Sequence, residues 1–250
     1  MTAAGKLLLS LRAALRQVAD PERAPQMQRY TKSAMPYHGV ASSSARAVFR
    51  RVLGAAPLPD AATWRKQVLG LWRGASHREE RYGALWLAGD RRARPFQDLE
   101  ALPMYEEMIV TGAWWDYVDD IASHRLGELL RRHPAPMRKA MLAWSRDDDL
   151  WKRRSSILCQ LTFKADTDLD LLYRCIEPSL ASKEFFLRKA IGWALRQYAW
   201  TDPDQVVRYV RAHEDRLSGL SRREALKNVG ERRPRHRAQR DGGQTTRPRS

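Results

Sequence analysis

The residues best suited to chemistry lie between Thr111 and Asp120, where two tryptophans and three aspartates fall within seven positions. Trp115 and Asp119 are four residues apart, so they share one face of a helix. A carboxylate beside an indole suits a cationic ligand, because the indole face attracts cations and the negative carboxylate balances their positive charge. Asp116 falls in the first turn, where its charge interacts favourably with the helix dipole, and we assign it no chemistry.

A metal site is not expected from these acids or from the rest of the chain. Asp116 and Asp120 share a helix face that Asp119 does not, so the three carboxylates do not converge. The two cysteines, Cys159 and Cys175, exclude a four-cysteine zinc site and a disulfide framework. The six histidines show no H-E-x-x-H or similar spacing. We therefore expect neither a metal nor another cofactor.

A second candidate surface lies on the helix expected at 184–199. Lys189, Trp193, Arg196 and Trp200 recur at spacings of 4, 3 and 4, which places them on one face. A stripe that alternates cations and indoles suits phosphates and sugars better than an apolar core. The alternative is a half-buried Trp193 with Arg196 stacked on it and no ligand.

Two further cations, Arg153 and Arg154, fall near the start of a helix expected from Leu150. Cations there oppose the helix dipole, so a nearby anion would account for them better than local structure does. A phosphate at a helix N-terminus would meet both an arginine and free N–H groups.

The charge of the chain indicates a polyanionic partner. Its 250 residues carry 45 Lys and Arg against 29 Asp and Glu, a net charge of +16. Residues 231–250 contribute five of these charges, so the preceding body is itself basic. This Arg-, Gly- and Pro-rich tail should be disordered, as either a nucleic-acid-attracting or an inert segment. No segment has the ~20 apolar residues that a membrane span needs, so we expect a cytoplasmic, nucleoid-associated protein.

The elements that position these residues are expected to be helices throughout, because helical periodicity is widespread and strand signals are scarce. Taken in pairs, the second helices start near residues 76, 114, 150 and 184, which is the period of helix-pair repeats. We therefore expect an all-α, curved, right-handed solenoid of antiparallel HEAT-like or armadillo-like helix pairs over 1–230, rather than an irregular helical bundle. Successive inner helices would then align the candidate residues along one groove. The expected helices are 6–18, 42–55, 60–74, 76–91, 98–111, 114–132, 136–146, 150–163, 168–180, 184–199, 203–217 and 221–229.

Several motifs, in order, resemble the AlkD-like DNA alkylation repair glycosylases. Two of them, W-W-D-x-V-D at 114–119 and K-A-I-G-W-x-L-R at 189–196, are specific in combination. The others are Met27–Lys32, Glu107–Thr111, Trp151–Arg154, Ser182–Phe186 and Ser221–Ala225. Together these motifs cover roughly residues 5–230.

The resemblance implies a solenoid of HEAT-like repeats that grips duplex DNA and excises cationic purines such as 3-methyladenine and 7-methylguanine. It implies that Asp119 is the catalytic carboxylate, that Trp115 and Trp193 flank the lesion, and that Arg154 binds a phosphate. Tyr30 would contact the lesion region or the backbone. The further expected DNA contacts are Lys32, Arg46, Arg153, Lys189 and Arg196.

Excision of a cationic base requires only one carboxylate, and Asp119 is the one clear carboxylate of the expected site. A cationic base already carries a positive charge, so it leaves neutral without the acid that ordinary glycosidases use. Asp119 would stabilise the oxocarbenium-like sugar and position a water. The main alternative is a non-catalytic helical module that binds DNA or RNA, and a protein-interaction scaffold is a third. A monomer is the simplest expectation.

Overall fold

The computed structural model describes residues 2–229, and over that range it is all-helical without a β-strand. The expected disorder of the basic tail at 231–250 lies outside the described residues. None of the described helices is long and apolar enough to cross a bilayer. The α-helices are α1 (Ala3–Arg16), α2 (Ala24–Thr31), α3 (Ser42–Val52), α4 (Ala61–Gly74), α5 (Arg78–Ala88), α6 (Leu102–Gly112), α7 (Trp115–Asp120), α8 (Gly127–Arg132), α9 (Pro134–Trp144), α10 (Leu150–Leu158), α11 (Leu169–Ile176), α12 (Phe185–Ala199), α13 (Pro203–Ala212) and α14 (Gly219–Leu226).

Short polar side chains define where many of these helices begin. The Asp60 carboxylate accepts a hydrogen bond from the Thr63 N–H at the start of α4. Asp149 accepts from two N–H groups at the start of α10. The side chains of Asp168, Asp202 and Ser218 each accept from one N–H group at the starts of α11, α13 and α14. Each cap pairs N–H groups that the helix leaves free, so these residues fix the helix boundaries.

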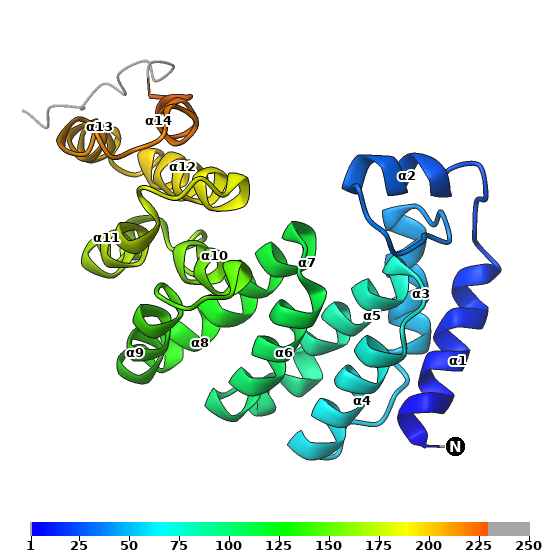
Figure 1. Ribbon diagram of the computed structural model, residues 1–250. Coiled ribbons are helices and arrows are strands. Elements are labelled where there is room, and N and C mark those ends of the chain that lie inside the picture. The colour runs from blue at the N-terminus through cyan, green and yellow to red at the C-terminus, as the bar shows by residue number, and fades with distance from the viewer. Residues whose placement is uncertain (1, 230–250) are drawn as a thin grey trace, which may run out of the picture.

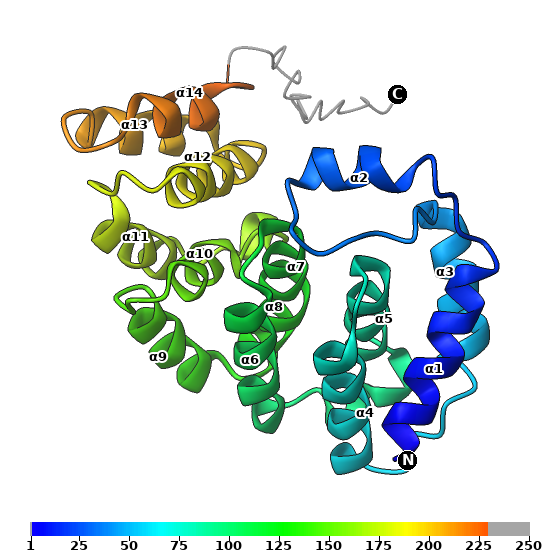
Figure 2. The same ribbon diagram turned by 45° about the vertical axis from the view of Figure 1, so that its right-hand side comes forward.

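The helices form two packed rows, which Figures 1 and 2 show running in chain order from α1 to α14. The inner row consists of α3, α5, α7, α10, α12 and α14, and each of these contacts the next. The outer row consists of α1, α4, α6, α9, α11 and α13, and most of these pack against the inner helix that follows. The rows bend, so that α2 and α12 lie on opposite sides of α7 (Figures 1 and 2).

The spacing of the inner helices confirms the repeat predicted from the sequence. Helices α5, α7, α10 and α12 begin at Arg78, Trp115, Leu150 and Phe185, each within two residues of the predicted start. Successive starts are 35 to 37 residues apart. The fold is therefore a helical-repeat solenoid, and not an irregular bundle.

The helix predicted over 114–132 is continuous but contains a π-helical turn. The turn η3 (Ile121–Leu126) joins α7 to α8. The Ser123 hydroxyl donates to the Asp119 carbonyl at 2.6 Å, within the stretch where the backbone ladder changes register. Such turns occur often at functional sites, and this one directly follows the candidate carboxylate.

Helix α2 was missed in the sequence, where only the Met27–Lys32 motif stood out. Its side chains are largely exposed, so they show no apolar stripe. The helix ends at Lys32, which has a left-handed φ of 51° and whose N–H bonds back to the carbonyls of the last turn. Local capping and loop contacts, rather than a buried face, therefore hold this helix.

Large aromatic side chains join the rows in the N-terminal half. Trp64 and Trp72 on α4 are almost fully buried. The Trp64 indole donates to the Leu87 carbonyl at 3.0 Å, and the Trp72 indole donates to the Thr111 hydroxyl at 2.9 Å. Burial of each indole is thus combined with a satisfied N–H group, which fixes α4 against α5 and α6.

Candidate active site

The candidate carboxylate Asp119 is held by Arg154 of the next inner helix. Nε and Nη2 of Arg154 donate to the two carboxylate oxygens at 2.7 and 2.8 Å, in a bidentate pair. Nη1 of Arg154 donates to the Phe186 carbonyl at the start of α12. The Arg154 residue is 4 % exposed, and the Asp119 side chain is 13 % exposed. The pair therefore fixes the carboxylate rigidly while leaving part of it accessible.

This geometry corrects the expectation for Arg154 that came from the sequence. An anion does account for the arginine near the start of α10, but that anion is the protein's own Asp119. The N-cap of α10 is Asp149, whose charge also offsets the cations at 152–154. A guanidinium has five N–H donors, and the described residues use three of those on Arg154, so its contact with a phosphate stays a prediction.

Burial raises the pKa of Asp119 above its ordinary value, although the hydrogen bonds from Arg154 act in the opposite direction. The nearby Asp116 charge adds to the increase. A less hydrated carboxylate interacts more strongly with a developing positive charge, because water screens it less.

Trp115 is half-buried beside Tyr30 of α2, with ring centroids 6.4 Å apart and an edge-on orientation. Tyr30 is 77 % exposed, so one of its faces is free to meet a ligand. The neighbouring Trp114 donates its indole N–H to the Thr31 carbonyl at 2.7 Å. That hydrogen bond ties the end of α2 to the start of α7 and thereby brings Tyr30 to Trp115.

An aromatic cluster brings together the starts of three inner helices. The ring centroids of Trp114, Trp151 and Phe186 lie between 5.0 and 6.2 Å apart. The predicted repeat requires these helix starts to lie side by side, and the cluster confirms it. Asp119 and Arg154 lie one turn deeper on two of the same helices.

Asp116 has a structural partner, as expected for a residue without assigned chemistry. Its carboxylate pairs with Arg78 at 2.5 and 2.6 Å and accepts from the Tyr82 hydroxyl at 2.5 Å. Arg78 is 3 % exposed, and its guanidinium lies 4.1 Å from the Tyr117 ring centroid. Arg78 was missed in the sequence, although this buried cation anchors the start of α7 against α5.

The predicted stripe on α12 is only partly correct. Lys189 and Arg196 both pair with Glu224 of α14, at 3.0 and 2.7 Å. The hydrogen bond from Lys189 lowers the pKa of Glu224, so the carboxylate stays charged. The two cations therefore join α12 to α14, and because one carboxylate serves both of them, their contact with DNA stays a prediction. Trp193 is half-buried on α12, one helix beyond Arg154 in the inner row.

The remaining predicted DNA contacts have no ion-pair partner among residues 2–229. Lys32, at the end of α2, and Arg46, on α3, are exposed. Arg153 is half-buried, and its Nε is shielded from water without a hydrogen bond. All three are thus available to an anion.

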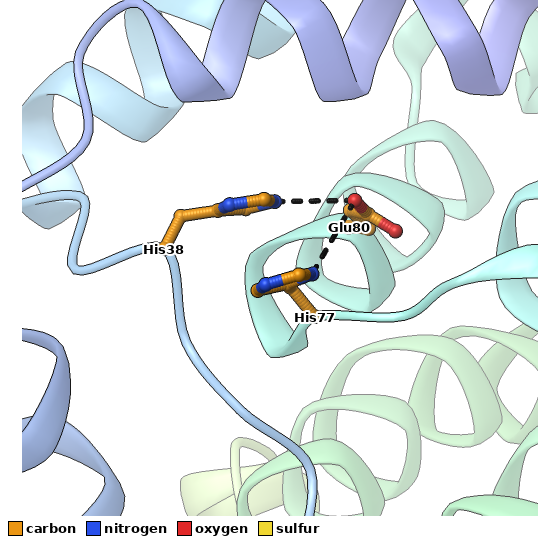
Figure 3. Close-up of side chains that lie close together, drawn as sticks. All are labelled: His38, His77 and Glu80. Carbon is orange, nitrogen blue, oxygen red and sulfur yellow. Dashed lines mark hydrogen bonds and ion pairs between the residues drawn. The ribbon is translucent and has the colours of Figure 1, made fainter. Parts of the chain in front are cut away.

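One cluster in the described part of the chain brings together groups that are capable of binding a metal. His38, His77 and Glu80 offer ligand atoms within 4.8 Å of one another (Figure 3). The two imidazole rings, however, are parallel within 7° with centroids 3.7 Å apart, so their in-plane lone pairs do not converge on one ion. The Glu80 carboxylate already pairs with Arg12 at 2.7 and 2.9 Å. The cluster fits an ion-pair network better than a metal centre.

This network anchors the loop after α2. Glu80 accepts from His38 at 3.1 Å and from the Ser76 N–H at 2.8 Å. The adjacent Glu79 accepts three backbone N–H bonds from residues 38–40. These contacts fix the segment that carries α2, and with it Tyr30, against α5.

Comparisons with known proteins give a family and a solved structure of similar fold. Residues 11–229 match the family model described as DNA alkylation repair enzyme. A solved structure, described as a predicted DNA alkylation repair enzyme from Enterococcus faecalis, is 28 % identical, with a TM-score of 0.74. The similarity covers 86 % of this chain and 98 % of that one. No curated protein matches the chain significantly. The chain belongs to the DNA alkylation repair enzyme family.

Proposed function

We propose that the protein is a monofunctional DNA glycosylase that hydrolyses the N-glycosidic bond of cationic alkylated purines in duplex DNA. The substrates would be bases such as 3-methyladenine and 7-methylguanine, and the enzyme would act as a monomer. The observation that carries this proposal is the partly exposed Asp119 carboxylate, which Arg154 holds by both oxygens and which lies four residues after Trp115 on α7.

The positive charge of the lesion replaces the general acid that the site lacks. A purine alkylated at N3 or N7 carries a positive charge, so the C–N bond breaks to release a neutral base without an acid. The electrons of that bond stay with the base, and the sugar becomes oxocarbenium-like. Asp119 would stabilise this cation and orient the water that attacks it. Loss of one such preorganised group costs about 3 kcal/mol of transition-state stabilisation or more.

The other residues would bind and position the substrate. Trp115 and Trp193 would contact the cationic base or sugar through their faces, each contributing about 1–2 kcal/mol when desolvated. Tyr30 would extend this aromatic surface from α2. Arg154, together with Arg153, Lys32 and Arg46, would contact phosphates. A normal purine lacks the charge and would not be released.

A non-catalytic DNA-binding module is the second candidate. The observation that favours it is the Asp119–Arg154 pair itself, because a buried bidentate ion pair between neighbouring helices also has a purely structural use. The basic charge of the chain fits both candidates.

The deciding experiment is base release from duplex DNA that contains 7-methylguanine, with protein in excess over DNA. We expect the wild type to release the base and Asp119→Asn to be slower by about 100-fold or more, which is about 3 kcal/mol. Glu128→Gln on α8 is the matched control, because this carboxylate is about one-third exposed and its nearest cation is 3.9 Å away. Equal rates in wild type and Asp119→Asn would remove Asp119 from the mechanism. Duplex binding without release by the wild type would favour the non-catalytic module.

A further inference from the structure

The histidine pair, which consists of His38 and His77, joins the loop after α2 to the start of α5 (Figure 3). The two rings are parallel within 7°, and their centroids lie 3.7 Å apart. The His38 side chain is 5 % exposed, whereas that of His77 is 25 % exposed. His77 is the N-cap residue of α5, which is packed within the inner row, so the stack holds the loop against a fixed helix.

The segment that carries α2 closes on itself at His38. The Asp20 N–H donates to the His38 carbonyl at 3.2 Å. The next residue, Gly39, has a left-handed φ of 83°, and a Cβ there would lie 1.9 Å from the Asp20 carbonyl oxygen. Helix α2 itself belongs to neither helix row (Figure 2) and is largely exposed. A change at His38 therefore acts on both ends of the segment that positions α2.

The charged side chains around the histidine pair come from α1 and α5. Arg12 of α1 donates to both oxygens of Glu80, at 2.7 and 2.9 Å. Glu80 also bonds to His38 at 3.1 Å, and the same carboxylate lies 3.9 Å from Nδ1 of His77. Glu79 accepts from three backbone N–H groups of the loop. Two carboxylates against one arginine compensate a proton on one imidazole, but not on both.

The stacked arrangement opposes a second proton. Burial lowers the pKa of His77, and so do the charges of His38 and Arg12. The carboxylates of Glu80 and Glu79 only partly offset this decrease. Protons therefore bind more readily to separated rings than to stacked ones. The contribution of the stack is complete above about pH 6.5, the ordinary pKa of histidine, and decreases as the pH falls below that value.

We propose that the histidine pair is a pH-sensitive anchor for α2: the stacked rings hold the segment at neutral pH, and protonation of both rings at acidic pH loosens it. The hydrogen bonds to Glu79 and the one from Trp114 to the Thr31 carbonyl do not involve the imidazoles, so α2 becomes more mobile without being released. Tyr30, which lies on α2 beside Trp115, would move with the helix. Acidification would thus alter the aromatic surface of the candidate site through a pair of residues outside it. The inference about α2 holds whether or not the protein is a glycosylase.

The test is the mobility of α2, measured by electron paramagnetic resonance with a nitroxide attached in Arg29→Cys. Arg29 is exposed on α2, and both natural cysteines are buried, so the reagent labels the new position alone. Spectra are recorded between about pH 5 and 8 with EDTA present, so that no metal ion contributes. We expect the mobile component of the spectrum to increase several-fold as the pH falls below about 6.5.

Substitutions of His77 separate protonation from stacking. In His77→Phe the ring stack is retained but cannot be protonated, so the label should stay immobile over the whole pH range. In His77→Gln the stack is lost, so the label should be mobile at every pH. His213→Phe is the matched control, because His213 stacks on Tyr209 of α13 with centroids 4.1 Å apart. This control should keep the wild-type pH response.

Three results would overturn the proposal. One is a pH-independent label in the protein with both histidines intact, and another is an equal pH response in His77→Phe. The third concerns a nitroxide in Arg211→Cys, at an exposed position of α13, where we expect no response. A response there equal to that on α2 would indicate general acid unfolding instead of a local anchor. Circular dichroism at neutral pH shows that each variant is folded.

Base release by the same proteins separates this inference from the proposed function. Wild-type release of 7-methylguanine together with a pH-independent label would refute the anchor and leave the glycosylase intact. A pH-dependent label that His77→Phe abolishes, without base release by the wild type, would support the anchor and refute the glycosylase.

Discussion

Removal of the Arg154 guanidinium tests whether the ion pair keeps the carboxylate of Asp119 ionised. In Arg154→Met the apolar chain is retained, but Asp119 loses both of its side-chain hydrogen bonds. An opposite charge at this distance lowers a carboxyl pKa by about 1–3 units, so the pKa of Asp119 should rise by that amount. Burial already raises that pKa in the intact pair.

The expected signature is a change in the pH profile of single-turnover base release. If Asp119 acts as a carboxylate, the rate falls as the pH decreases through the pKa of Asp119. The acid limb should therefore move upward by about one unit or more in Arg154→Met, so that the activity that disappears at low pH returns at higher pH. A general loss of structure would lower the rate at every pH instead.

Arg154→Met should also lower the free energy of unfolding, which is measured in urea. Breaking a buried pair leaves one charge uncompensated, at a cost of about 3 kcal/mol, the low end of the usual range because Asp119 remains 13 % exposed. The double variant Asp119→Asn/Arg154→Met should be less destabilised than the sum of the single variants, by about 1–3 kcal/mol. Arg73→Met, in the exposed pair with Glu107, should leave the free energy of unfolding nearly unchanged. An unmoved acid limb together with an additive cycle would refute this reasoning.

Three further outcomes are expected. Glu80→Gln should lower the free energy of unfolding in urea by about 3–5 kcal/mol at pH 7. Burial raises the pKa of Glu80, but hydrogen bonds from Arg12, His38 and the Ser76 N–H outweigh it and hold the pKa far below its ordinary 4.5. The contribution of Glu80 to stability is therefore complete above pH 4.5 and should decrease as the pH falls below 4.5. Gly192→Ala should lower thermal stability by about 1–3 kcal/mol, because the new Cβ would lie 2.4 Å from the Glu224 Cβ and force α12 from α14; Gly219→Ala, where only the end of an arginine is near, should cost less. Trp115→Ala should slow single-turnover base release by about 5–30-fold, the equivalent of 1–2 kcal/mol of cation–π interaction, and Trp115→Phe should restore part of that loss; an unchanged rate in the alanine variant would remove Trp115 from the lesion site.

The fold was largely predictable because helix caps and hydrophobic periodicity are local signals. Among the inner helices, α10 and α14 begin at the Asp149 and Ser218 caps, and the spacing of the inner helices revealed the repeat. Helix α2 was not predicted because it buries little apolar surface. Its stability comes from contacts with residues remote in the sequence. The Trp114 indole that reaches the Thr31 carbonyl is 83 residues away along the chain.

The identity of the site residues was more predictable than their partners. The spacing of Trp115 and Asp119 along one helix face is a local property, whereas the partner of each charged group lies in another repeat. The ion-pair partner of Lys189 and Arg196 was not predicted, because Glu224 is 35 and 28 residues away from them along the chain. Local helix geometry covers only neighbours three or four residues apart.

The repeat length itself provides the missing rule. Four ion pairs between neighbouring repeats join residues separated by about one repeat: 35 for Asp119 with Arg154, 35 for Lys189 with Glu224, 38 for Arg78 with Asp116 and 34 for Arg73 with Glu107. Equivalent positions of stacked repeats face each other, so opposite charges one period apart should pair. A search for opposite charges 34 to 38 residues before Arg154 gives Asp116, Asp119 and Asp120, a short set that includes the actual partner.

The Asp119–Arg154 pair is therefore one member of a series of inter-repeat ion pairs, and this has a consequence for mechanism. The existence of this pair alone does not distinguish a catalytic role from a role in joining the repeats, because the Arg73–Glu107 pair in the outer row has nearly the same separation without a role in the proposed chemistry. What sets Asp119 apart is its surroundings: a carboxylate with a raised pKa, partly open, on the helix face that carries Trp115. A purely structural pair would respond to substitution only in stability. If Asp119 also performs chemistry, substitution of Arg154 must in addition shift the pH at which base release begins. This shift in the pH profile identifies the catalytic carboxylate.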